Sequence, residues 1–206
     1  MAPIVMMLAA VVLSLSPAPV VEYLTEIGFG AEFGQSSHVL HRWEADVRVH
    51  AHGEPTEADL VTLNEVVQEL DMLIPTLTIE ITDNNPNVAI HFMPESEFAL
   101  VDPQYVPVNM GYFRVWWDGQ GVINRSRILI ATQGVNQTER SHLIREELTQ
   151  SLGLFNDSWQ YQDSIFYQGW TDTTEYSALD RQVISMMYSP DLWVGMSREE
   201  LRDMHD

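Results

Sequence analysis

Apolar residues recur along the chain with two different periods, one typical of strands and one typical of helices. Between residues 41 and 50 they stand at every second position, which predicts a strand with one buried face. From 57 to 72 they recur every three or four positions, which predicts an amphipathic helix with Thr56 as its N-cap. Further strands are predicted at 76–82, 87–93, 111–117 and 127–131.

A second helix is predicted from residue 139 to 152, with Thr138 as its N-cap. Gly153 follows it and suits the left-handed backbone at a helix end. A candidate helix near 176–187 lies in the loop-rich tail. Because no internal repeat interrupts this order, we expect one α+β domain over residues 37–206.

The first residues predict export. An apolar run over residues 4–15 is followed by small residues and prolines, as in a signal peptide. We therefore expect residues 1–19 to be a signal peptide, with a retained N-terminal anchor as the alternative, and the protein to be secreted or periplasmic. Residues 20–36 are rich in glycine and polar side chains, which favours a leading arm.

The charge of the chain restricts its partners. The formal net charge is −20, the chain has arginine but no lysine, and cysteine is absent. A surface of this kind repels phosphate, which argues against nucleic acid as a partner and leaves the N-terminal segment as the one route to a membrane. The acidic, lysine-free composition also suggests a salty external medium.

One carboxylate on the second helix requires an explanation. On a helical wheel His142, Glu146 and Gln150 form one stripe, because they are four residues apart. Glu147 falls instead on the apolar arc, between Leu143 and Ile144. A carboxylate there is costly unless it is paired, protonated or facing a cleft, so Glu147 is a candidate functional residue.

Residues 146–156 (EELTQSLGLFN) have the spacing of the metzincin signature HExxHxxGxxH. In that signature, helix residues four apart point two ligands at one zinc ion, and the intervening Glu activates the metal-bound water. Residues 184–188 (ISMMY) resemble the methionine turn of the same peptidases. The resemblance implies a metzincin-like mixed sheet and a long active-site helix, with a substrate peptide lying along the strand beside the cleft.

Three segments also resemble an uncharacterised family of secreted bacterial proteins that carries EExxQ in place of HExxH. They are residues 146–157 (EELTQSLGLFND), 163–167 (DSIFY) and 179–196 (LDRQVISMMYSPDLWVGM).

The metzincin resemblance implies a set of site residues. Glu147 takes the place of the general base, and Glu146, Gln150 and Asn156 take the ligand positions. Two neutral amides make a poor site for zinc.

The remaining candidates follow from the same helix and turn. A harder divalent cation would need Asp157 beside Glu146, with His142 as a further candidate ligand. The pair Glu146 and Glu147 could also divide acid and base roles without a metal. Tyr188, at the end of the methionine turn, is the third candidate catalytic residue.

Structural alternatives exist for most of these residues. His142 suits a partly exposed helix position, and Gln150 and Asn156 suit hydrogen-bonding roles in a core or cap. Met186 and Met187 suit core filling.

Three functions therefore compete. The favoured one is a zinc-less, metallopeptidase-like protein that binds a peptide or an envelope partner in the old cleft. The alternative is an active hydrolase, a peptidase with Glu147 as general base. The third is a structural envelope protein without a functional cleft.

Overall fold

The computed structural model describes residues 17–30 and 38–204. Residues 1–16 of the predicted signal peptide and 31–36 of the predicted arm lie outside this part. The described residues form one mixed sheet: β3, β2, β4 and β6 are parallel neighbours in that order, and β5 pairs antiparallel with the other edge of β6. The strands are β1 (Arg42–Trp43), β2 (Val47–Gly53), β3 (Ile79–Ile81), β4 (Val88–Met93), β5 (Gly111–Trp117) and β6 (Val122–Ala131).

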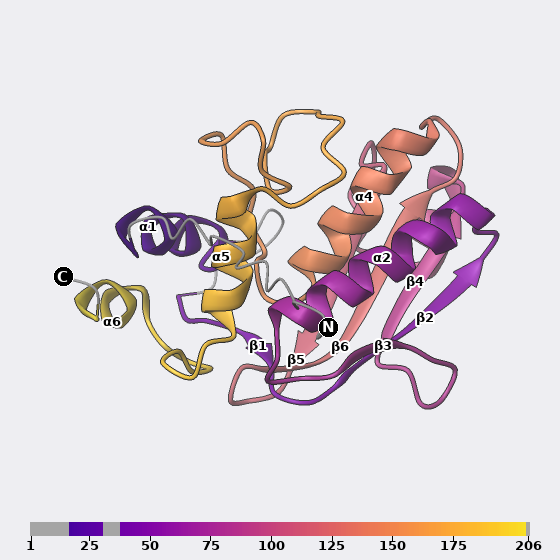
Figure 1. The fold of residues 1–206 in the computed structure, drawn as a ribbon. Helices are drawn as coiled ribbons and strands as arrows, with labels where there is room; N and C mark the ends of the chain where they lie inside the picture. The colour runs from indigo at the N-terminus through magenta and orange to yellow at the C-terminus, as the bar shows by residue number, and fades with distance from the viewer. Residues whose placement is uncertain (1–16, 31–37, 205–206) are drawn as a thin grey trace, which may run out of the picture.

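Two long helices run side by side over one face of this sheet (Figure 1). They are α2 and α4, while α1, α5 and α6 gather at the other end of the molecule. The helices are α1 (Pro17–Ile27), α2 (Glu57–Leu73), α3 (Phe98–Val101), α4 (Gln137–Gln150), α5 (Ala178–Met187) and α6 (Arg198–Asp203), with a 3-10 turn η1 (Glu95–Glu97) before α3. None of these helices is long and apolar enough to cross a membrane.

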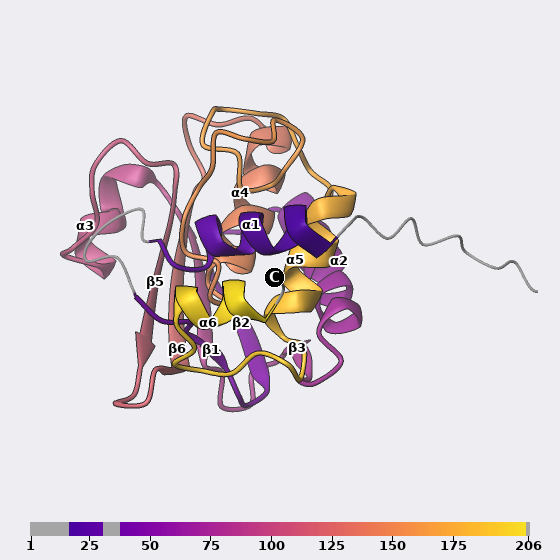
Figure 2. The ribbon, with the colours of Figure 1, turned by 90° about the vertical axis from the view of Figure 1, so that its left-hand side faces the viewer.

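Alternation along the central strands decides which face is buried. In β4, Val88, Ile90 and Phe92 point into the core beneath the helices, whereas His91 between them points to the opposite face and is half-buried. A smaller apolar cluster of Phe98, Tyr105, Tyr112, Leu129 and Ala131 covers part of that opposite face. Figure 2 shows α3 on the side of the sheet away from α2.

The two long helices are joined by a buried carboxylate. Asp59 closes the capping box of α2 with Thr56 and is fully buried. The same carboxylate accepts hydrogen bonds from Arg140 Nε at 2.7 Å and Gln137 Nε2 at 2.9 Å, both on α4. The residue that caps the start of α2 therefore also fixes the position of α4 beside it.

Several predicted elements are confirmed. Thr56 is the N-cap of α2, β5 spans the predicted 111–117, and α5 lies within the predicted 176–187.

Other predictions differ from the structure. The predicted strand 41–50 is divided between β1 and β2, because residues 44–46 are exposed and leave the sheet. The predicted strand at 76–82 is ordered as a strand only over Ile79–Ile81, and the one at 127–131 begins earlier, at Val122. The second helix begins after Asn136, which forms a capping box with Glu139, and not after Thr138.

The prediction of a leading arm is also wrong for residues 20–27. This segment is helix α1, and Tyr23, Leu24 and Ile27 are fully buried against the rest of the core. Glycine content alone pointed to a linker, but the apolar positions of α1 recur at helical spacing and bury one face.

The predicted methionine turn is the final turn of a helix. Met186 and Met187 end α5, and Tyr188 is its C-cap. Met187 is nevertheless buried beneath the end of α4: a Cβ added at Gly153 would lie 2.9 Å from its Cε.

Candidate functional site

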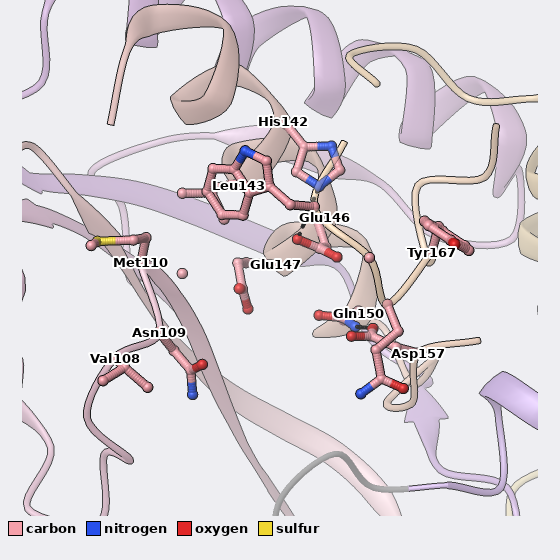
Figure 3. Close-up of a pocket in the computed structure, with 14 residues that line it drawn as sticks. Val108, Asn109, Met110, His142, Leu143, Glu146, Glu147, Gln150, Asp157 and Tyr167 are labelled. Atoms are coloured by element: carbon pink, nitrogen blue, oxygen red, sulfur yellow. Dashed lines mark hydrogen bonds and ion pairs between the residues drawn. The ribbon is translucent and has the colours of Figure 1, made fainter. Parts of the chain in front are cut away.

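A polar pocket of about 190 Å³ lies between α4 and the start of β5. Its walls come from α4, from the chain entering β5 and from a loop that follows α4 (Figure 3). The lining residues are Val108, Asn109, Met110, Gly111, His142, Leu143, Glu146, Glu147, Gln150, Asp157, Tyr167, Gln168, Gly169 and Trp170. The pocket thus contains the predicted helix stripe and Glu147 together.

The helix presents this stripe because its two ends are fixed. The Asn136 capping box starts α4, and the chain turns away after it at Gly153, whose φ is +115°. A Cβ at Gly153 would lie 2.1 Å from the His41 carbonyl oxygen, so only glycine allows this close approach. The turn brings Asp157 back to the pocket beside Gln150.

His142 is buried, whereas its predicted structural role was that of a partly exposed helix residue. Its Nδ1–H donates to the Thr173 carbonyl oxygen at 2.6 Å, and Nε2 lies 3.3 Å from Glu146 Oε2. Because a carbonyl and a carboxylate both need a proton from the ring, the doubly protonated imidazolium fits this position. Burial opposes that charged form, but the hydrogen bond and charge of Glu146, the Thr173 carbonyl and the charge of Asp157 outweigh it and raise the pKa of His142.

Gln150 is a positioning residue for Asp157. Its buried amide Nε2 donates to Asp157 Oδ1 at 2.6 Å. The donor group of the amide therefore points at the carboxylate, which holds Asp157 in the pocket.

Glu147 lies on the pocket wall and is only 7% exposed. It faces the first residue of β5: a Cβ built on Gly111 would lie 2.2 Å from Glu147 Oε1 and 2.9 Å from Leu143 Cδ2. Glycine at 111 is what allows the carboxylate to stand against the strand backbone. Together with Glu146 and Asp157, Glu147 makes the pocket strongly acidic.

Arg145 and Arg181 are the arginines that could give Glu147 a structural role as the partner in a buried ion pair. Both arginines instead pair with Glu69 on α2, Arg145 Nη1 at 2.5 Å from Glu69 Oε2. The arginine network on this side of α4 is therefore separate from the carboxylates that line the pocket.

Two sequence-predicted site residues lie outside the pocket. Asn156 faces the end of α1, where its Nδ2 donates to the Glu26 carbonyl at 3.3 Å. Tyr188 is buried, donates to the Leu152 carbonyl at 2.6 Å and accepts from the Trp43 backbone N–H at 3.3 Å. Both residues serve the packing of the chain and not the chemistry of the pocket.

Part of the pocket wall was not predicted from the sequence. Tyr167, Trp170 and residues 108–110 line the pocket but carry no spacing that links them to α4. The one available signal was the family-like segment 163–167, which ends at Tyr167.

The donor set does not fit zinc. Glu146 is engaged by His142, Gln150 directs its N–H group at Asp157, and Asn156 points elsewhere. No group of three or more His, Asp or Glu side chains among residues 17–30 and 38–204 is arranged to hold a metal ion. Zinc sites need imidazole, thiolate or carboxylate donors that converge on one point.

The strand beside the pocket is an edge strand. β5 pairs with β6, and the described residues place no strand on its other side. Its outer backbone N–H and C=O groups are therefore the kind of template to which another extended chain can pair.

Comparisons with known proteins place the chain in a family but give no residue roles. Two structures of myroilysin are similar at 13% and 14% identity, with TM-scores of 0.47 and 0.43; the alignments cover 85% and 88% of this chain and 96% and 90% of the other. The similarity is distant and assigns no function here. No curated protein sequence matches the chain. Residues 18–205 match the family described as "Protein of unknown function (DUF2927)", and the chain belongs to that family.

Proposed function

We propose that the protein binds an extended peptide along the outer edge of β5, as a metallopeptidase-like protein without the zinc ligands. The observation that supports this most directly is the position of the pocket: it opens where β5 begins, with Gly111 in its wall, and no strand of the described residues pairs with the outer edge of β5. Main-chain hydrogen bonds would supply affinity, and side chains that enter the pocket would supply specificity.

The metzincin-like spacing of residues 146–156 supports the same reading. In metzincins the strand next to the cleft lines the substrate peptide, and here the helix with that spacing packs against β5. The pocket retains the carboxylate in the general-base position, Glu147, while the ligand positions have been taken over by the His142–Glu146 pair and by the Gln150–Asp157 hydrogen bond.

A neutral heptapeptide of alternating threonine and glutamine, blocked at both ends, tests this proposal, because it matches the seven residues of β5 and favours an extended backbone. We expect fluorescence anisotropy to show saturable binding of the labelled peptide. Trp170→Ala should weaken it by about tenfold, roughly 1.4 kcal/mol, because an exposed tryptophan on the pocket wall supplies contact area.

The matched control is Trp193→Ala, because Trp193 is also exposed but does not line the pocket. The affinity of the Trp193→Ala variant for the peptide should equal that of the unmodified protein. Absence of peptide binding, or equal losses in the two variants, would overturn the proposal.

Hydrolysis is the second candidate function, and the convergence of Glu146, Glu147 and His142 in one pocket favours it. A carboxylate base and an imidazolium acid are the two groups that acid–base hydrolysis needs. New peptide N-termini, detected by mass spectrometry in a mixture of unstructured peptides, should then appear with the unmodified protein and be absent with Glu147→Gln. If Glu147→Gln cleaves equally well, Glu147 is not the base.

A further inference from the structure

The face of the sheet opposite α2 and α4 concentrates basic side chains on an otherwise acidic protein. The strand registers align Arg114 with Arg127, Arg127 with Ala89, and Ala89 with His50, which puts one side chain from each of four strands in a row on this face. By the same alternation, the face carries Arg48, His50, His52, His91, Arg114, Arg125 and Arg127. Four of the chain's ten arginines thus share one face of the sheet.

Three of these arginines surround one indole ring. The guanidinium carbons of Arg125, Arg114 and Arg127 lie 3.9, 4.9 and 5.4 Å from the centroid of Trp116. The electron-rich face of tryptophan attracts cations, so Trp116 holds the three side chains in place despite their mutual repulsion.

The charges in this cluster are only partly neutralised. Asp102, whose side chain is fully buried, pairs with Arg114 Nη1 at 3.0 Å and with Arg127 Nη1 at 3.2 Å. Arg125 is exposed and forms no ion pair with the described residues. The nearest acid along β5, Asp118, accepts hydrogen bonds from the backbone of its own turn.

This cluster extends onto β5, which is an edge strand among the described residues. Trp116 and Arg114 belong to β5 itself, and Arg125 stands opposite Trp116 on β6, with its guanidinium carbon 3.9 Å from the centroid of the Trp116 ring. A peptide paired to β5 would have every second side chain on this face, next to the cluster.

Resting on the peptide-binding function proposed above, we propose that the bound peptide is an alternating acidic one, whose carboxylates meet Arg125 and Arg114 on the open face of the sheet. Its intervening side chains turn toward α4, where Glu146, Glu147 and Asp157 disfavour further acids. If the peptide moved by one residue along β5, its acidic side chains would turn toward α4 and the intervening ones toward the arginines. The opposite charges of the two faces therefore also select the register of the peptide.

The preference for an acidic peptide depends on the local arginine cluster, although the net negative charge of the whole protein would repel such a peptide. At about 0.15 M salt the repulsion from distant carboxylates is screened over roughly 8 Å, whereas a carboxylate in contact with Arg125 is much less affected. Peptide affinity measured at this ionic strength therefore reflects contacts with the arginine cluster and not the net charge of the protein.

Three blocked heptapeptides of alternating sequence test the proposal: threonine with glutamate, with glutamine and with lysine. At about 0.15 M salt, we expect the glutamate peptide to bind about two- to fivefold more tightly than the glutamine peptide, as for exposed carboxylate–arginine pairs. Arg125→Gln should reduce this preference, because only Arg114 of the two proposed contacts then remains. Arg48→Gln, which removes the same charge from the same face at β2, should leave the preference intact.

The results separate this inference from the proposed function. If the glutamine peptide binds but the glutamate peptide binds no better, or if Arg125→Gln leaves the preference unchanged, the acidic-peptide inference is wrong and peptide binding stands. A tighter lysine peptide would also contradict it and would point to the carboxylates of the pocket as the specificity determinant. If none of the three peptides binds, the proposed function itself fails.

Discussion

Glu147 is a buried carboxylate that shares its pocket with two other acids, and like charges in a shared site oppose one another. Glu146 and Asp157 line the same pocket, while Arg145 and Arg181 are committed to Glu69. Groups placed for binding or catalysis commonly reduce stability in this way.

We therefore expect Glu147→Gln to leave the free energy of unfolding unchanged or higher. The substitution keeps the shape of the side chain, removes a like charge and strands neither Arg145 nor Arg181. Chemical denaturation measures the effect. Glu69→Gln is the comparison, because it strands buried Arg145 and should cost about 3 kcal/mol or more. A clear loss of stability in Glu147→Gln would identify Glu147 as a structural residue.

The raised pKa of His142 predicts a specific dependence of stability on pH. A histidine whose folded pKa exceeds its unfolded value, about 6.5, contributes stability that is complete below about pH 6.5 and is lost as pH rises through the folded pKa. The stability advantage of the unmodified protein over His142→Gln should therefore shrink as pH increases above about 6.5. An advantage that stays constant or grows with pH would show that His142 is neutral in the folded state.

At the scale of single residues, the sequence predicted which side chains of α4 share the pocket but not what they do there. Helical spacing was sufficient to bring His142, Glu146 and Gln150 together. Their partners Thr173 and Asp157 come from later loops, whose paths depend on tertiary packing and leave no periodic pattern in the sequence. Asn156 was misplaced for the same reason, because it packs against α1.

At the scale of elements, the contact between α2 and α4 depends on Asp59. Burial alone would raise the pKa of this carboxyl, but hydrogen bonds from Gln137 and Thr56 and the charge of Arg140 outweigh it and lower the pKa. Its contribution to stability is therefore present above about pH 3.8 and is lost as pH falls through the lowered pKa.

Asp59→Asn should cost about 3–5 kcal/mol in the free energy of unfolding at neutral pH, because it leaves Arg140 without its buried partner. Glu65→Gln, an exposed change on the same helix, should stay within about 0.5 kcal/mol. Equal effects of the two substitutions, measured by urea denaturation, would show that the Asp59–Arg140 pair does not hold the helices together.

Elements were predicted well where one face is buried and one exposed. This applies to α2, β4 and β5, whose periods persist over several residues. The extent of β6 was underestimated, because exposed polar residues such as Asn124 and Arg125 interrupt its apolar pattern. α1 was missed because its neighbouring glycines suggested a linker, although the family match begins at residue 18 and includes this helix.

At the scale of the whole molecule, the net charge of −20 opposes the compact state. Added salt screens this repulsion, so we expect the melting temperature to rise steadily from low to about molar sodium chloride. Ion pairs such as Arg140–Asp59 are buried and lose little under the same conditions. A melting temperature that stays flat or falls with salt would show that surface repulsion does not limit the stability of this protein.

The central claim is that an extended peptide pairs with the outer edge of β5, and amide hydrogen exchange tests it most directly. With the neutral threonine–glutamine heptapeptide at saturation, exchange should slow at the outward-facing amides of Gly111–Trp117, because they become hydrogen-bonded to the peptide. Exchange in β3, the strand at the opposite edge of the sheet, should be unchanged. Unchanged exchange in β5 under conditions where the peptide is bound, or slowing confined to another surface, would contradict the account.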